Sequence, residues 1–222
     1  MVKKANTRNS MIELLRILSM FIIVIHHYAV HGTYALAMNS GRKIGGGDKA
    51  YLILHFSGRI GVTVFVLIGA YFLSAKRFNF KRPISLLVIT FFYSWALFLA
   101  FEVVHPELVH VVLNGSIWFK TLVPYVMPYS YWFVNAYIVM LLLMPVLNLI
   151  LKNLTQRSLL LLVIFLFVIN SILPSLAIIF PRIDFSASDL GYSTGGYFLF
   201  IYLLAGYLYR KNQVGFYHLS FQ

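Results

Sequence analysis

Six long runs of apolar residues, separated by more polar segments, dominate the hydrophobic pattern of the chain. Each run has about 20 residues or more, the length that an α-helix needs to cross the hydrocarbon core of a bilayer. Strands of a membrane barrel are about half as long and alternate apolar with polar residues, which these runs do not. The pattern therefore predicts membrane-spanning helices at 11–30, 51–75, 83–102, 130–151, 158–181 and 190–209.

Composition supports this interpretation. Hydrophobic residues make up 60% of the 222 residues and charged residues 11%, against about 45–50% and about 25% in ordinary soluble domains. The chain has no Cys, which excludes disulfides and thiolate ligands, and His26, His27 and His31 alone make no clear tetrahedral metal site. We expect an all-α, polytopic integral membrane bundle of about six transmembrane helices, forming one domain over residues 1–222.

The basic charge of the chain is distributed unevenly between the predicted loops. The sequence has 18 Lys and Arg, 6 Asp and Glu and a net charge of +12. With a cytoplasmic amino terminus, the inner segments carry +11 of this charge and the outer segments +1. The positive-inside rule predicts such an asymmetry. The charge is therefore a topology signal for a multi-pass protein of the cell membrane surrounded by lipid, and no nucleic-acid partner is expected.

Three ionisable residues in the first run suggest chemistry, because charges are costly in a membrane helix. Glu13 precedes Arg16 by three residues and can pair with it. Arg16 and His27 are 11 residues apart, which places them on one helix face with an axial separation of about 16 Å. Two simpler explanations stay open: Arg16 reaches lipid phosphates, and His27 makes an interhelical hydrogen bond. His26 points about 100° away from His27, and a structural role is favoured for it.

Four segments in order resemble the membrane acyltransferase family 3. The first runs from Glu13 to His27, with ten residues between the arginine and the histidine. The others are the glycine-rich helix 58–73, the Trp-Phe segment 132–138 with Pro-Val-Leu-Asn at 145–148, and Leu-Ala-Gly-Tyr at 204–207. The family usually has Ser-Gly where this chain has Gly69-Ala70. Both residues are small, so close helix packing is retained.

The resemblance implies an enzyme that transfers an acyl group, commonly acetyl, from acyl-CoA to a hydroxyl of a bacterial cell-envelope carbohydrate or lipid-linked glycan. It implies that His27 is the catalytic base or nucleophile, supported by Glu13, which orients Arg16, and that Arg16 contacts acyl-CoA. Arg59, His26 and Trp132 are candidates for acceptor-binding or supporting roles. Acyl-CoA is a substrate here, and no permanently bound cofactor is expected.

Two alternatives to catalysis remain at this point: a membrane transporter lined by Arg16, His27 and Arg59, and a noncatalytic membrane protein or relic. The six predicted helices are fewer than the family's catalytic unit has, so we expect a chain truncated at its carboxyl terminus. Such a chain would insert in the membrane but show little turnover by itself, unless a partner chain completes the bundle around His27.

Overall fold

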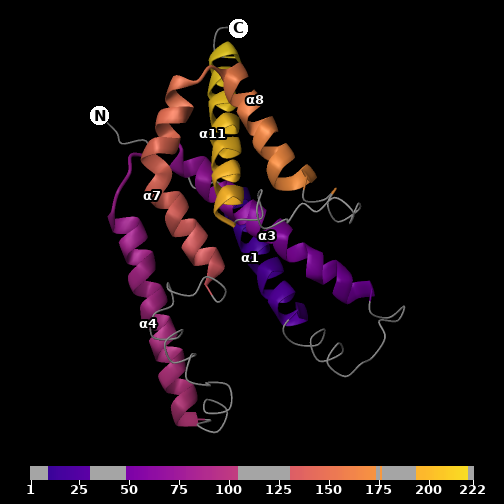
Figure 1. Cartoon of the computed structure of the whole chain (residues 1–222), viewed down its shortest axis with the longest axis vertical. Helices are drawn as coiled ribbons and strands as arrows, with labels where there is room; N and C mark the ends of the chain where they lie inside the picture. Colours follow the sequence, from indigo (N-terminus) through magenta and orange to yellow (C-terminus); the bar gives the residue numbers. More distant parts are fainter. Residues whose placement is uncertain (1–9, 31–48, 105–130, 174–175, 177–193, 220–222) are drawn as a thin grey trace.

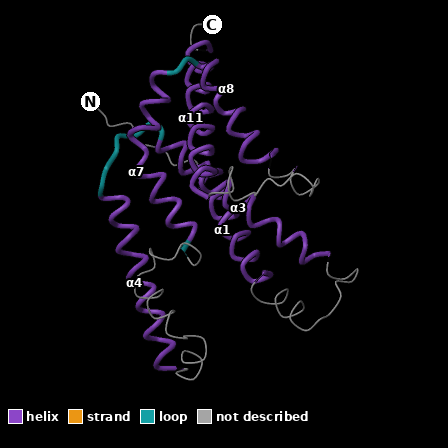
Figure 2. The backbone as a smooth tube through the Cα atoms, in the orientation of Figure 1, coloured by secondary structure: helices purple, strands orange, loops and turns teal. Residues whose placement is uncertain are grey.

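The computed structural model describes residues 10–30, 49–104, 131–173, 176 and 194–219. Within these residues the regular elements are all helices (Figures 1 and 2). The helices are α1 (Ser10–Tyr28), α3 (Lys49–Leu73), α4 (Lys81–Val104), α7 (Trp132–Asn153), α8 (Gln156–Phe167) with the π-helix η3 (Val168–Ile172), and α11 (Thr194–Leu219).

These helices coincide with the six apolar runs and confirm the all-helical membrane fold. Helices α1, α4 and α7 are long and apolar enough to cross a membrane, and shorter apolar helical stretches occupy Ser57–Leu73 and Gln156–Ile172. The end of the fifth run and the start of the sixth lie outside the described residues. The last helix continues to Leu219, beyond the expected end at residue 209, because hydropathy shows where a helix becomes polar and not where it stops.

Helix α11 lies at the centre of the bundle, between α7 and α8 in Figure 1. It contacts α3, α7 and α8, and its residues Phe198, Ile201, Tyr202 and Ala205 are completely buried. Apolar side chains of the three neighbouring helices complete the core around it, among them Val66, Ala70, Met140, Met144, Leu159 and Val163. The core therefore consists of α11 and the faces of α3, α7 and α8 that pack around it.

Helices α1 and α4 lie at the periphery of this core. Helix α1 packs mainly against α3, and α4 packs against α7. Small residues permit a close approach of α1 and α3, since a Cβ at Gly61 would stand 2.8 Å from the Ser19 carbonyl oxygen. The remaining faces of both outer helices expose large apolar residues, among them Phe21, Val24, Val88 and Phe92. Such faces suit contact with lipid or with other membrane helices.

The turn between α7 and α8 is held by hydrogen bonds with α11. The Arg210 guanidinium donates to the carbonyl oxygens of Leu151 at 2.6 Å and Leu154 at 2.9 Å. The Gln156 amide donates to the Tyr207 carbonyl oxygen at 3.3 Å. Carbonyls at a helix end have no partner within the helix, and here an arginine from another helix supplies one. The final turn of α7 is thereby fixed to α11.

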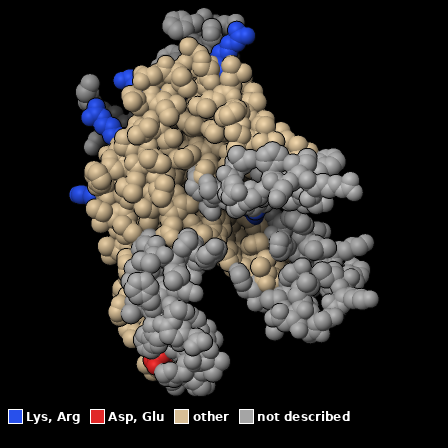
Figure 3. Space-filling model, in the orientation of Figure 1, with Lys and Arg blue, Asp and Glu red and all other residues tan. Residues whose placement is uncertain are grey.

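Basic residues gather at the end of the bundle where this turn lies, which we call the basic end. Figure 3 shows most of the visible Lys and Arg atoms toward it and the visible acidic atoms at the opposite end. The turn between α3 and α4 belongs to the same end, because the Asn148 amide donates to the Lys76 carbonyl oxygen at 3.3 Å. Residues of the basic end are Lys76, Arg77, Lys81, Arg82, Lys152, Arg157, Arg210 and Lys211.

Candidate functional site

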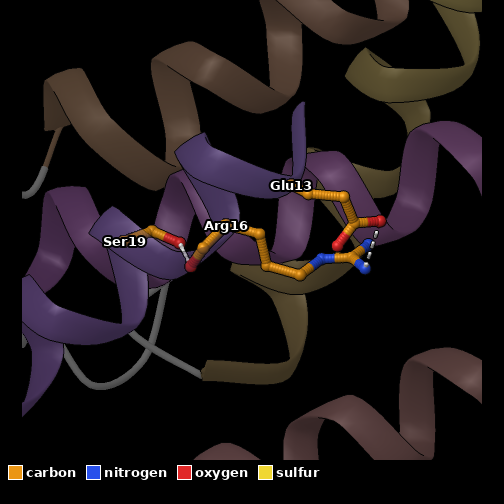
Figure 4. A network of polar contacts seen from close by, with 3 residues as sticks. All are labelled: Glu13, Arg16 and Ser19. Carbon is orange, nitrogen blue, oxygen red and sulfur yellow. Dashed lines mark hydrogen bonds and ion pairs between the residues drawn. The ribbon is translucent and has the colours of Figure 1, made fainter. Parts of the chain in front are cut away.

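Glu13 and Arg16 form an ion pair on α1, as their spacing predicts. The Arg16 Nη1 and the Glu13 Oε1 are 3.8 Å apart, and the two side chains are 35% and 43% exposed, respectively. Figure 4 shows the two side chains extended toward one another along the helix, with the Ser19 hydroxyl donating to the Arg16 carbonyl oxygen at 2.8 Å. Glu13 thus restrains the guanidinium without covering it.

His27 lies near the other end of α1, on its exposed side. Its Nδ1 is 2.8 Å from the Ile23 carbonyl oxygen. A carbonyl only accepts hydrogen bonds, so Nδ1 carries the proton and Nε2 is the basic nitrogen of the ring. Because α1 is a continuous helix from Ser10 to Tyr28, the separation from Arg16 is about 16 Å along its axis. The imidazole therefore has the tautomer that a base acting through Nε2 needs.

His26 occupies the contact between α1 and α3. Its Nδ1 is 3.2 Å from the Leu54 carbonyl oxygen, and its ring lies where a side chain at Gly58 would be. The rings of His26 and His27 meet edge to face, with centroids 5.4 Å apart. His26 therefore joins the two helices and lies against one side of the His27 ring, a supporting position.

Arg59 and Trp132, the other two candidates, lie on different helices. Arg59 follows Gly58 on α3, so its backbone is at the His26 end of the contact with α1, and its side chain is exposed. Trp132 begins α7, is 37% exposed and packs edge to face against Phe133 of the same helix. The structure thus groups Glu13 with Arg16 and His26 with His27, and it places Trp132 on a helix that contacts α4 and α11.

A second group of polar residues was not identified from the sequence. The completely buried Tyr202 of α11 donates to the Asn148 Oδ1 of α7 at 2.8 Å. The Asn148 side-chain amide also donates a hydrogen bond to the Lys76 carbonyl oxygen, at the turn that leads into α4. These bonds connect three parts of the chain in the half of the bundle nearer the basic end. They also fix the turn that precedes Arg82.

Arg82 and Tyr137 lie on α4 and α7, two helices that contact each other. The Arg82 Nη1 is buried and has no hydrogen-bond partner among the described residues. The Tyr137 hydroxyl would be 3.1 Å from a Cβ at Gly69 of α3. Tyr137 therefore packs closely against α3.

Sequence reasoning missed the hydrogen bonds among Lys76, Asn148 and Tyr202 for a definite reason. These bonds join a turn and two helices that are far apart in the sequence. A run of apolar residues predicts where a helix lies but not which side chains of two helices meet. Nothing in a single sequence therefore places residues 76, 148 and 202 beside one another.

Among the described residues, no group of three His, Cys, Asp or Glu side chains could hold a metal ion. The arrangement offers instead an imidazole and, about three helical turns away on the same helix, the guanidinium group of Arg16. A family model described as an acyltransferase domain matches residues 9–217. No curated protein and no solved structure matches the chain. Because the match covers nearly all of its length, the chain belongs to acyltransferase family 3 and is an acyltransferase domain of a membrane type.

Proposed function

We propose that this acyltransferase transfers an acyl group, acetyl in the first instance, from acyl-CoA to a hydroxyl of an extracytoplasmic or lipid-linked carbohydrate. The observation that carries the proposal is His27 on the exposed side of α1, with Nδ1 bonded to the Ile23 carbonyl. Family membership favours acyl transfer over the transporter alternative.

The positions of the Lys and Arg side chains support binding of acyl-CoA at the basic end. Coenzyme A is polyanionic and does not enter hydrocarbon unaided, so its phosphates belong near Lys and Arg side chains. Arg16 lies between the basic end and His27 along α1, about 16 Å from His27. An extended pantetheine arm covers a distance of this order, so it can carry the thioester from the arginines toward the imidazole.

The chemistry of the step follows from the tautomer of His27. Nε2 accepts the proton of the acceptor hydroxyl while the hydroxyl oxygen attacks the thioester carbonyl carbon. The carbon–sulfur bond then breaks, and the proton on Nε2 goes to the departing CoA thiolate. Transfer through an acyl-histidine uses the same nitrogen as nucleophile. In both versions the Ile23 carbonyl keeps the Nδ1 proton in place, and Arg16, restrained by Glu13, contacts the donor.

The charge asymmetry supports the orientation that this reaction needs. With the basic end in the cytoplasm, acyl-CoA is available where the arginines are, and His27 lies toward the outer surface of a multi-pass cell-membrane protein. His26, Arg59 and Trp132 then belong to the outer side, where the carbohydrate acceptor arrives. A partner chain against the exposed side of α1 would exclude water and lipid from the thioester.

Transfer of label from [acetyl-¹⁴C]acetyl-CoA to the cell-envelope carbohydrate of membranes from the source cell tests the proposal. Such membranes retain any partner chain. We expect incorporation with the wild-type protein and a loss of about 10²- to 10⁴-fold with His27→Ala, the range typical of a missing general base. His26→Ala is the matched control; it removes the neighbouring ring and should retain a substantial part of the activity.

Expression of both variants is compared by immunoblot, so that an unstable protein is not mistaken for an inactive one. The proposal is wrong if wild-type membranes transfer no label, or if the His26 variant is inactive and the His27 variant active at equal expression.

A further inference from the structure

Two hydroxyl groups join α3 to α11 near the start of α11, about 20 Å along that helix from Arg210 of the basic end. The Thr63 and Tyr197 hydroxyl oxygens are 2.6 Å apart, and the Thr63 hydroxyl also donates to the Arg59 carbonyl oxygen at 2.6 Å. A hydroxyl has one proton to donate, and Thr63 uses its proton in the bond to Arg59. The Tyr197 O–H therefore donates to Thr63, and the Tyr197 oxygen can only accept any further hydrogen bond.

The Tyr197 ring is fixed by aromatic neighbours. Phe200, buried one turn farther along α11, has its ring centroid 6.2 Å from that of Tyr197. Phe200 in turn contacts Phe167 of α8, at a centroid distance of 6.1 Å. The Tyr197 side chain is half-buried against the core. Because the ring contact and the bond to Thr63 both hold it, the oxygen loses little freedom when a ligand binds.

The hydrogen-bonding groups around Tyr197 determine which ligand chemistry fits there. An oxygen that only accepts favours a ligand with O–H or N–H groups over carboxylates and phosphodiesters, which have no proton to donate. The exposed side chain of Arg59 ends in a guanidinium with N–H donors only. Arg59 and Thr63 are four residues apart, so they lie on adjacent turns of one face of α3. A donor beside an acceptor matches carbohydrate hydroxyls, each of which both donates and accepts.

These groups lie on a different side of α3 from the histidines. His26 meets α3 at Gly58, where a side chain would overlap its ring. Thr63 is five residues farther on, which is about 7.5 Å along the helix and about 140° around it. A carbohydrate whose reacting hydroxyl is at His27 must therefore extend around α3 to reach Tyr197.

We propose that Tyr197 binds the acceptor carbohydrate by accepting a hydrogen bond from a hydroxyl of a sugar unit other than the one that is acylated, with Arg59 donating to the same unit. The inference rests on the proposed function for the carbohydrate as substrate. It adds a binding residue of α11, and it makes the acceptor a glycan of more than one sugar unit. Binding of a remote unit holds the reacting hydroxyl in position.

Binding of source-cell envelope polysaccharide to the purified chain in lipid nanodiscs tests this inference without catalysis. The polysaccharide is immobilised, and retention of the nanodiscs is measured by surface plasmon resonance. Tyr197→Phe and Thr63→Val both remove the hydrogen bond between α3 and α11, but only Tyr197→Phe removes the phenolic oxygen. We expect Tyr197→Phe to weaken binding by about five- to tenfold, the value of one hydrogen bond, and Thr63→Val by less than about twofold.

A kinetic measurement in source-cell membranes separates the two substrates. Tyr197→Phe should raise KM for added polysaccharide by about five- to tenfold and leave KM for acetyl-CoA unchanged. Tyr93→Phe, which removes the hydroxyl of a 59% exposed residue of α4, is the matched control and should change neither KM. Thermal unfolding in nanodiscs shows whether each variant is folded. Tyr197→Phe and Thr63→Val should lower the unfolding temperature equally, because each loses the same interhelical bond.

Each result decides for or against the proposal. Equal polysaccharide affinity of the wild type and a folded Tyr197→Phe variant would overturn it, as would a wild-type chain that retains no polysaccharide. Equal weakening by Tyr197→Phe and Thr63→Val would also overturn it, because the hydroxyl would then serve only the packing of α3 against α11. Binding that depends on the Tyr197 oxygen, without acyl transfer in source-cell membranes, would support the carbohydrate site and refute the proposed function.

Discussion

At the scale of single residues, small differences in surroundings separate neighbours that look alike in the sequence. His26 and His27 both bond a carbonyl through Nδ1, but His26 bonds one on α3 and His27 one on its own helix. A bond across helices makes a side chain part of the packing. A bond within the helix sets the tautomer and leaves the ring on the exposed side of α1, where it can meet a substrate.

Arg16→Lys should lower kcat/KM for acetyl-CoA by about tenfold while changing the free energy of unfolding by less than about 1 kcal/mol. The pair with Glu13 is partly exposed and its charged atoms are 3.8 Å apart, so it contributes little to stability. The planar guanidinium contacts a phosphate through two donors, whereas an ammonium is a point charge. Initial rates with labelled acetyl-CoA and thermal unfolding measure the two quantities.

Arg157→Lys, at the exposed start of α8, is the matched control and should alter neither quantity. A large loss of stability in the Arg16 variant, without a change in kcat/KM, would show that Arg16 serves the fold instead of the donor.

At the scale of helices, the sequence predicted where the helices lie along the chain but not how they pack against one another. An apolar run of about 20 residues is sufficient to indicate a membrane helix, so the expected segments and the observed helices coincide. The π-helix Val168–Ile172 and the contact of Gly61 with Ser19 were not predicted, because hydropathy contains no information about partners. The Glu13–Arg16 pair was predictable because both residues share one helix. The hydrogen bond between Tyr202 and Asn148 was not, because it depends on how separate helices pack.

Gly61→Ala should separate α1 from α3. The added Cβ would stand 2.8 Å from the Ser19 carbonyl oxygen, and a backbone atom cannot move aside as the end of a side chain can. Overpacking of this kind costs about 1–3 kcal/mol. We expect a lower unfolding temperature in detergent and, since His26 and His27 lie on α1, lower acyl transfer.

Ile60→Ala changes the adjacent residue, which is 62% exposed, and serves as the control with little expected effect. An unfolding temperature for Gly61→Ala equal to that of the wild type would mean that α1 and α3 are less closely packed than the structure has them.

At the scale of the whole molecule, the basic residues and the buried core are distributed differently. The basic residues mark one end of the bundle (Figure 3), whereas the buried core follows α11 along its length. The candidate site extends from the half of the bundle near the basic end to a helix outside the core. The arginines belong to the half nearer the basic end, and His27 lies farther along α1, on a helix outside the core. In the proposed reaction, an acyl group bound near the arginines therefore moves along the bundle to reach the imidazole.

The basic end should face the cytoplasm. The sequence has no Cys, so single cysteines can be introduced at Asn79, Asn153, Lys43 and Ser186 without background labelling. In intact cells an impermeant thiol reagent should label positions 43 and 186 and leave 79 and 153 unlabelled until the membrane is opened. Labelling of position 79 with protection of 43 would reverse the orientation.

The central position of α11 has a consequence for how the protein is made. Helices α3, α7 and α8 leave the ribosome before α11 does, yet all three pack against α11 in the core. Until that segment is synthesised, the earlier helices remain in the bilayer without their common partner, and the last turn of α7 waits for the guanidinium of Arg210. Assembly of the bundle core is therefore a late event in translation, and an insertase would have to hold the earlier helices until α11 is made.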